Sequence, residues 1–185
     1  MKAKKGEIIK DILLAVGAVG FIILAGALAP NVLKIFQYTD RKSSKIKYSA
    51  KQAKRSLYNL EHRGMVAIGQ KGEKTIIRLT KKGKSRVLKY NFEKIKIETQ
   101  KRWDKKWRII IFDIPELHKS ARIAFMRKLR EIGFSMFQKS VWIIPYPCED
   151  EIDFIKEIYG ITQHVNLIIA EKIDKESKFK KIYNL

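Results

Sequence analysis

The stretch from residue 107 to residue 145 limits the fold more than any other part of the chain. It opens with Ile109-Ile110-Ile111-Phe112, an apolar run that is rich in β-branched residues and too short for an independent helix, so it predicts a buried strand. The segment that follows has apolar residues at helical spacing, and Gly133 is expected to end this helix. Two short β-rich runs, 134–138 and 141–144, predict two further strands.

Two more elements complete this domain. Residues 149–158 place their apolar side chains on one side of a predicted helix, and residues 165–173 predict another strand. The resulting order, βαββαβ, is that of the ferredoxin-like unit. We therefore predict a ferredoxin-like domain over residues 107–173.

Several motifs of this domain follow one another in a characteristic order. The first strand ends in Asp113-Ile114-Pro115, the helix carries Arg and Leu at regular spacing, and Gly133-Phe134 precedes Gln138-Lys139-Ser140-Val141-Trp142. In this combination the domain resembles the small CRISPR-associated adaptation subunit, the second of the Cas proteins. The resemblance is specific for the fold and less specific for the function.

The positive charge of the chain is concentrated in its middle. The formal net charge is +21, and residues 41–108 carry 23 Lys and Arg against 5 Asp and Glu, whereas residues 109–185 carry 12 against 11. Such a segment predicts a polyanionic partner, with nucleic acid first and an anionic membrane surface second; a solvated, solubilising face is the alternative. The single cysteine, Cys148, allows no internal disulfide and suits a reducing cytoplasm.

Residues 12–29 are uncharged and mostly apolar, which is near the length of a membrane span. Many of them are Ala or Gly, and a helical apolar stripe already begins at Ile8, so we expect a helix that is buried under others, interrupted near the glycines and ended by Pro30. A membrane anchor or a signal peptide remains the alternative for this segment.

Residues 48–87 contain the signals of a DNA-binding module. After a basic loop at 39–47, Ser49 begins a helix and Gln52 follows three positions later, which is the pattern of a capping box. Residues 65–70 and 75–80 predict two strands joined across a Gly-containing turn, and a further helix follows Thr80. The residues expected on the outer face of the first helix are Lys51, Gln52, Lys54, Arg55 and Tyr58.

In this order, residues 6–90 resemble a winged helix-turn-helix domain. The resemblance implies that the outer face of the helix starting at Ser49 reads base edges in duplex DNA, which requires long hydrogen-bond donors. It also implies that Lys71, Lys74 and Arg78 of the hairpin, or wing, hold phosphates. The alternative is a basic surface helix that is only solvated.

We expect four parts in the chain: a winged helix-turn-helix domain at 1–90, a connecting helix at 91–106, the ferredoxin-like domain at 107–173 and a short tail at 174–185. This α+β arrangement resembles the phenylacetate-repressor (PaaX-type) transcriptional regulators. The resemblance implies a cytoplasmic homodimer, formed through the ferredoxin-like domain, that binds specific double-stranded DNA sequences as a repressor. The chain departs from the family pattern in its very apolar first helix and in the few residues after its last strand.

The competing hypothesis is a nuclease. In the CRISPR subunit, an aspartate at the end of the first strand is linked to metal-dependent cleavage, and Asp113 is the matching residue here. A carboxylate suits Mg²⁺ or Mn²⁺, the only cofactors that the chain would then need. Glu116 is the only other acid nearby, so a simple strand-to-helix turn is the alternative role of Asp113. The three histidines, His62, His118 and His164, are expected to be surface or packing residues.

Overall fold

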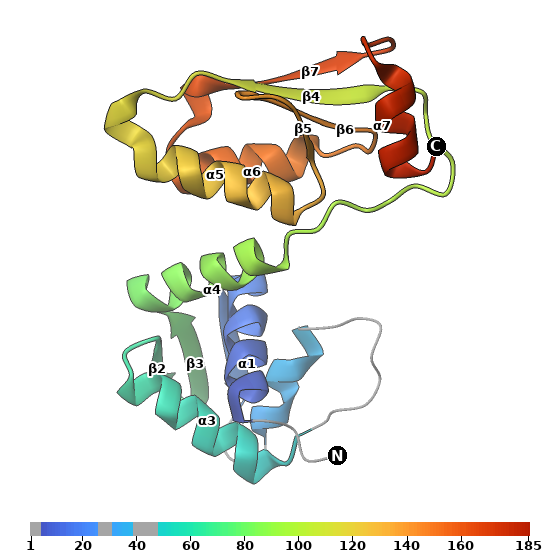
Figure 1. Cartoon of the computed structure of the whole chain (residues 1–185). Coiled ribbons are helices and arrows are strands. Elements are labelled where there is room, and N and C mark those ends of the chain that lie inside the picture. Colours follow the sequence, from blue (N-terminus) through green and yellow to red (C-terminus); the bar gives the residue numbers. More distant parts are fainter. Residues whose placement is uncertain (1–4, 26–30, 39–47) are drawn as a thin grey trace. The chain divides into compact units, whose positions relative to one another are not determined.

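The computed structural model describes residues 5–25, 31–38 and 48–185. The chain divides into two compact units, Met1–Lys94 and Ile95–Leu185, each with its own antiparallel sheet and helices (Figure 1). The predicted α+β class is therefore confirmed. The predicted loop at 39–47 and the predicted helix end at Pro30 lie outside the described residues.

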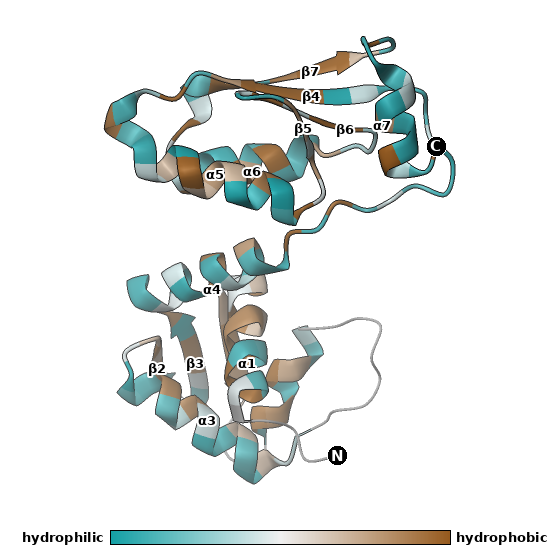
Figure 2. Ribbon diagram, viewed as in Figure 1, coloured by the Kyte–Doolittle hydropathy of each residue, from teal (hydrophilic) through white to brown (hydrophobic). Residues whose placement is uncertain are grey.

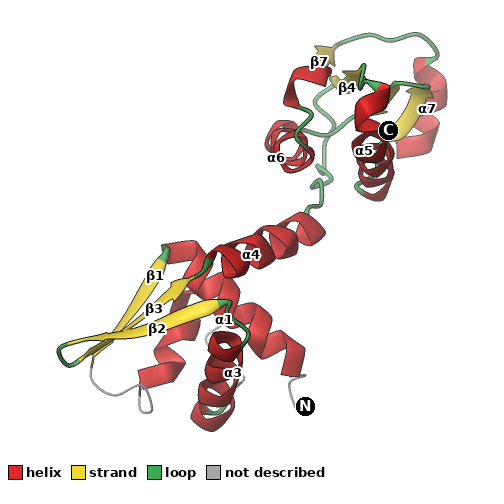
Figure 3. Cartoon of the chain, turned by 90° about the vertical axis from the view of Figure 1, so that its left-hand side faces the viewer, coloured by secondary structure: helices red, strands yellow, loops and turns green. Residues whose placement is uncertain are grey.

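The N-terminal unit combines helices with a three-stranded sheet in the order β1-β3-β2 (Figure 3). Both strand pairs are antiparallel, and Ile77 in the central strand lies opposite Ile22 on one side and Ile68 on the other. The elements are α1 (Lys5–Val19), β1 (Phe21–Ala25), the 3₁₀ helix η1 (Val32–Tyr38), α3 (Ala50–His62), β2 (Val66–Lys71), β3 (Lys74–Leu79) and α4 (Lys81–Lys94).

The single interrupted helix predicted for residues 12–29 is wrong. Helix α1 ends at Val19, Gly20 takes a left-handed backbone conformation with φ of 79°, and Phe21–Ala25 forms a strand. Strand formation follows from the bulky and β-branched side chains of this segment, which alternate between buried and exposed positions as they do at a sheet surface. No helix among the described residues combines the length and the apolar character that a membrane crossing requires.

The apolar first helix has a structural role in the core of this unit. Ile12, Leu13 and Val16 of α1 are fully buried. They belong to one cluster with the inner faces of β1 and α3, and Figure 2 shows the apolar residues of α1 within the unit. Asp11 accepts a hydrogen bond from the Tyr48 hydroxyl at 2.6 Å, which ties the middle of α1 to the residue before the α3 cap. Burial among other elements accounts for an apolar character that would otherwise suggest lipid.

The C-terminal unit has the predicted order of strand, helix, strand, strand, helix, strand. Its four-stranded sheet has the order β5-β6-β4-β7, with every neighbouring pair antiparallel. Alternate residues of β4 face opposite sides, so Phe112 meets Phe125 of α5 while Trp107 meets Phe179 of α7. The elements are β4 (Trp107–Phe112), η2 (Glu116–His118), α5 (Lys119–Glu131), β5 (Ser135–Gln138), β6 (Val141–Ile144), α6 (Glu149–Tyr159), η3 (Thr162–His164), β7 (Val165–Ala170) and α7 (Glu176–Tyr183).

The connecting helix predicted for residues 91–106 is mostly wrong, because α4 ends at Lys94 and residues 95–106 form no helix. Ile95, Ile97 and Thr99 alternate with polar residues, and β-branched side chains lower helix propensity. Further along, Lys105 has φ of 61°, and the backbone N–H of Lys106 donates to the Asp104 carboxylate at 3.0 Å. These features make a turn before β4.

The tail predicted at 174–185 is part of the C-terminal unit, because most of it forms α7. Phe179 is buried, and it stacks on Phe137 with ring centroids 5.3 Å apart. The Tyr183 hydroxyl accepts the Ser135 backbone N–H at 2.9 Å and lies 2.7 Å from the Ile143 carbonyl oxygen. The two residues thus dock on the sheet of their own unit.

Candidate nucleic-acid interface

The start of α3 is fixed by the predicted capping box, which the structure confirms. The Ser49 hydroxyl accepts the Gln52 backbone N–H at 3.2 Å, and the Gln52 side-chain oxygen accepts the Ser49 backbone N–H at 2.9 Å. Two otherwise unpaired backbone donors are satisfied in this way. The arrangement also holds the Gln52 side chain at the helix end and leaves only its NH₂ group to contact a ligand.

The outer face of α3 is polar and positively charged. Lys51, Gln52, Arg55 and Tyr58 are exposed, as predicted from the helical spacing. Lys54 is half-buried, and its ammonium lies 5.9 Å from the centroid of the Tyr58 ring. The inner face buries apolar residues, so the helix cannot rotate without exposing them.

A cavity of about 490 Å³ lies beside this face. Asn59 and His62, which were not among the predicted contacts, line it together with Arg55. They lie four and seven positions after Arg55, so the same helical spacing could have identified them. The remaining lining residues are Ile8, Gln52, Ser56 and Tyr58.

The hairpin of β2 and β3 carries the other predicted contacts. Gly72 has φ of 58°, which suits the two-residue turn between the strands, and the exposed residues Lys71 and Lys74 pair directly across it. Arg78 is also exposed, but it lies near the far end of β3, opposite Phe21 of β1. The structure therefore brings Lys71 and Lys74 together at the turn and places Arg78 apart from them.

Thr80 joins the hairpin to the two helices around it. Its hydroxyl donates to the Gly64 carbonyl at 2.6 Å and accepts the backbone N–H of Gly83 at 3.1 Å, so it caps α4 and holds the turn after α3. A side chain at position 83 would overlap the Met65 carbonyl oxygen. The Thr-x-x-Gly spacing of the sequence thus encodes the close approach of α4 to the segment between α3 and β2.

The cations of α3 and the hairpin have no acidic partners in the described part of the chain. None of the ion pairs between described residues includes Lys51, Lys54, Arg55, Lys71, Lys74 or Arg78. Their charges face solvent and are uncompensated locally. Such a surface attracts phosphates by a long-range, salt-dependent force.

Asp113, the residue predicted under the nuclease hypothesis, is exposed just after β4. Its backbone N–H donates to the His164 carbonyl at 3.0 Å. Glu116 lies nearby in sequence, but Lys119 and Arg122 bind its carboxylate at 3.0 Å and 2.7 Å and hold its pKa below the usual value. Across residues 5–25, 31–38 and 48–185, no group of three or more His, Cys, Asp and Glu side chains is placed to hold a metal ion.

The histidines are less scattered than their spacing suggested. The rings of His118 and His164 have centroids 6.0 Å apart in the C-terminal unit, although the two residues are far apart in sequence. His62 lies at the end of α3 in the other unit. The pairing arises because η2 and η3 meet where β4 and β7 pair, a proximity that only the fold creates.

Comparison with known families identifies the C-terminal unit. Residues 100–182 match the sequence model of the family described as the PaaX protein central Cas2-like domain. No curated protein matches the chain. The matched segment includes the turn before β4 and nearly all of α7, which lie outside the predicted boundaries of 107–173. The match covers less than half of the chain, and it shows that residues 100–182 are similar to the central Cas2-like domain of PaaX proteins.

Proposed function

We propose that the protein is a homodimeric repressor that binds specific sequences of double-stranded DNA. In this proposal the N-terminal unit is a winged helix-turn-helix domain and the C-terminal unit is a ferredoxin-like dimerisation domain. The observation that carries the proposal is the outer face of α3, a capped helix whose unpaired cations stand in the same unit as a hairpin with two lysines at its turn. The element order and the β1-β3-β2 sheet order support it.

The residues have separate roles in this proposal. Lys51 and Arg55 reach from α3 to base edges in the major groove, where Arg and Lys donate to guanine. Lys54 and Tyr58 contact the sugar–phosphate backbone of the DNA next to these bases. Gln52 contributes chiefly by capping the start of α3. Lys71 and Lys74 place the hairpin against phosphates. Arg78 contacts the backbone only where DNA extends along β3.

The second sheet keeps exposed apolar side chains on the face that α7 covers only in part, and these side chains support the dimer. Ile111 is 38% exposed and Ile168 44% exposed, and both lie on the face opposite α5 and α6. Exposed apolar side chains on a sheet are a common feature of subunit interfaces. A twofold dimer presents two copies of α3, so we expect a palindromic operator. Occupation of such an operator excludes other proteins from the same DNA, which is how it represses transcription.

The first experiment selects binding sites from random duplex DNA with the full-length protein at about 0.15 M salt. We expect a palindromic motif. Arg55→Ala is expected to weaken binding about 10-fold or more and to relax the preference at one base position of each half-site. Lys89→Ala is the matched control, because Lys89 is an exposed cation on α4. Equal losses of affinity in the two variants would show that only net charge matters.

A second step of the same experiment addresses the nuclease alternative. The bound DNA is incubated with Mg²⁺ or Mn²⁺, and the repressor proposal expects it to stay intact. Cleavage that requires the metal and disappears in Asp113→Ala would instead assign Asp113 a catalytic role. The dimer has its own test: Ile111→Lys with Ile168→Lys should give monomers in analytical ultracentrifugation, whereas an unchanged mass would place the interface elsewhere.

A further inference from the structure

A second group of cations belongs to the C-terminal unit, whereas the proposed recognition helix belongs to the N-terminal unit. The turn at residues 101–106 carries Lys101, Arg102, Lys105 and Lys106, and α7 carries Lys178 and Lys181. All six side chains are exposed, and none forms an ion pair with a described residue. We call these six residues the α7 basic surface.

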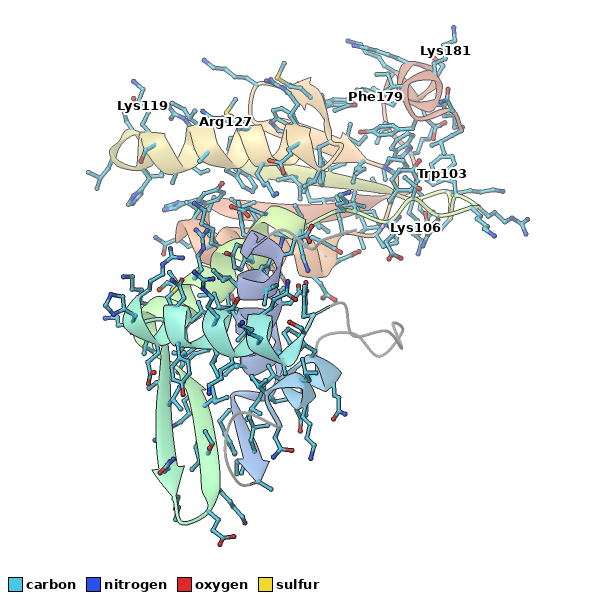
Figure 4. The ribbon with its side chains drawn as sticks, turned by 90° about the horizontal axis from the view of Figure 1, so that it is seen from below. Trp103, Lys106, Lys119, Arg127, Phe179 and Lys181 are labelled. Carbon is cyan, nitrogen blue, oxygen red and sulfur yellow. The ribbon has the colours of Figure 1, made fainter. Side chains whose placement is uncertain are left out.

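Aromatic contacts hold the turn in place against α7. The Trp103 ring lies 5.1 Å from the Trp107 ring between centroids, and the Lys180 ammonium lies 5.3 Å from the Trp103 centroid. The Trp103 indole N–H donates to the Lys106 carbonyl at 3.1 Å, which closes the turn. Figure 4 shows Trp103 near Phe179, with Lys106 on the turn and Lys181 on the outside of α7. The cations therefore project from a fixed framework rather than from a free tail.

The acidic side chains of these segments, Asp104 and Glu176, bind other residues of the C-terminal unit and do not pair with the six cations. Asp104 binds both terminal nitrogens of the buried Arg108, at 2.9 Å and 2.7 Å. Glu176 accepts the indole N–H of Trp107 at 3.1 Å and the Lys180 ammonium at 2.8 Å. Asp104 and Glu176 thus bind residues of the framework and not the six lysine and arginine side chains of the surface. The charges of these six side chains remain exposed to solvent.

We infer that the α7 basic surface binds the phosphate backbone of duplex DNA that flanks the operator. Ordered, uncompensated cations are what backbone contacts require, and they carry no sequence information. The surface belongs to the same chain as α3, so DNA held by the N-terminal unit raises the effective concentration of flanking phosphates near it. The inference rests on the proposed DNA-binding function and adds a second contact region to it.

The test compares two variants that lose the same charge. The first is Arg102→Gln, Lys106→Gln and Lys181→Gln, which removes half of the α7 basic surface. The control is Lys119→Gln, Arg127→Gln and Lys139→Gln, which removes three exposed cations from α5 and the β5–β6 turn of the same unit (Figure 4). Lys105 is left unchanged because of its left-handed backbone. Affinity is measured for the full chain on the selected operator, either alone or with about 15 base pairs of added duplex on each side.

We expect the wild type and the control to bind the long duplex at least 10-fold more tightly than the short one. The α7 variant should lose this advantage but bind the short duplex as the wild type does. Its salt dependence on the long duplex should fall by about 0.9 in log–log slope for each phosphate that the variant no longer neutralises. Arg55→Ala should weaken binding to both lengths, so failure of the proposed recognition by α3 is distinguishable from failure of this surface.

Three results would overturn the inference. The α7 variant could keep the length dependence of the wild type, or the control could lose it equally, in which case only net charge acts. The α7 variant could also keep its DNA affinity and lose binding to vesicles of phosphatidylserine and phosphatidylcholine, which would assign the surface to an anionic membrane. Circular dichroism and thermal melting of both variants should match the wild type, because the substituted side chains are exposed. Among them, only Lys119 forms an ion pair with another described residue, Glu116.

Discussion

Trp107 and Glu176 are 69 positions apart, and the indole N–H of Trp107 donates to the Glu176 carboxylate at 3.1 Å. This bond joins the first strand of the C-terminal unit to its last helix. It lies beside a cluster in which Trp107, Ile143 and Phe179 are buried together. The end of the chain therefore completes the core of this unit, although its sequence suggested a charged tail.

We predict that Phe179→Ala destabilises the C-terminal unit by about 3–4 kcal/mol, because it removes a buried ring and leaves a cavity against Phe137 and Trp107. Urea unfolding followed by tryptophan fluorescence measures the change. Ile182→Ala on the same helix is the control; its side chain is 49% exposed, and the expected change is within about 0.5 kcal/mol. Similar stabilities for the two variants would mean that α7 does not contribute to the core.

We predict that Gly83→Ala destabilises the N-terminal unit strongly, although alanine favours helices in general. The new methyl group would overlap the Met65 carbonyl oxygen, so α4 would have to move away from the turn after α3. Gly69→Ala is the matched control, since open space surrounds that position. Thermal melting distinguishes the two. An unchanged melting temperature for Gly83→Ala would contradict the close approach and the proposed coupling of α3 to the hairpin.

We predict that Asp104 stabilises the C-terminal unit in a pH-dependent way. Hydrogen bonds from Arg108 lower the pKa of Asp104 below its ordinary 3.8. A lowered folded-state pKa means that the stabilisation is complete above about pH 4 and is lost as the pH falls through the lowered value. Asp104→Asn should therefore reduce stability at pH 7, and the loss should shrink as the pH falls below 3.8. A loss of stability that does not change with pH would show that the charge of Asp104 does not matter.

We predict that Cys148 is unreactive in the folded protein. The side chain is 1% exposed, and burial raises the pKa of the thiol to about 12, so almost no thiolate exists at neutral pH. A disulfide-exchange reagent at pH 8 should label no cysteine in the native chain and one per chain in denaturant. Rapid labelling of the native protein at the rate of a free thiol would contradict this burial.

The residue pattern was sufficient to predict local features of the proposed site. It was not sufficient to predict which residues from different elements lie close together. Ser49 and Gln52 encode the capping box within four residues, and helical spacing correctly placed Lys51 and Arg55 outward. The separation of Arg78 from Lys71 and Lys74 follows from strand length and pairing, which fix where each side chain of a hairpin lies. His118 and His164 meet only because β4 and β7 pair, and no local pattern reports such a contact.

Local sequence patterns were sufficient to predict the order of strands and helices in residues 107–170, the hairpin after α3 and the concentration of positive charge, because these depend on periodicity, turn residues and composition. The other elements depend on contacts between distant parts of the chain. Phe21–Ala25 becomes a strand because β3 supplies its hydrogen-bond partners, and the end of the chain becomes α7 because the sheet offers an apolar surface for Phe179. In both segments, the stabilising free energy comes from contacts with residues that are distant in sequence. Local propensity therefore cannot predict these two elements.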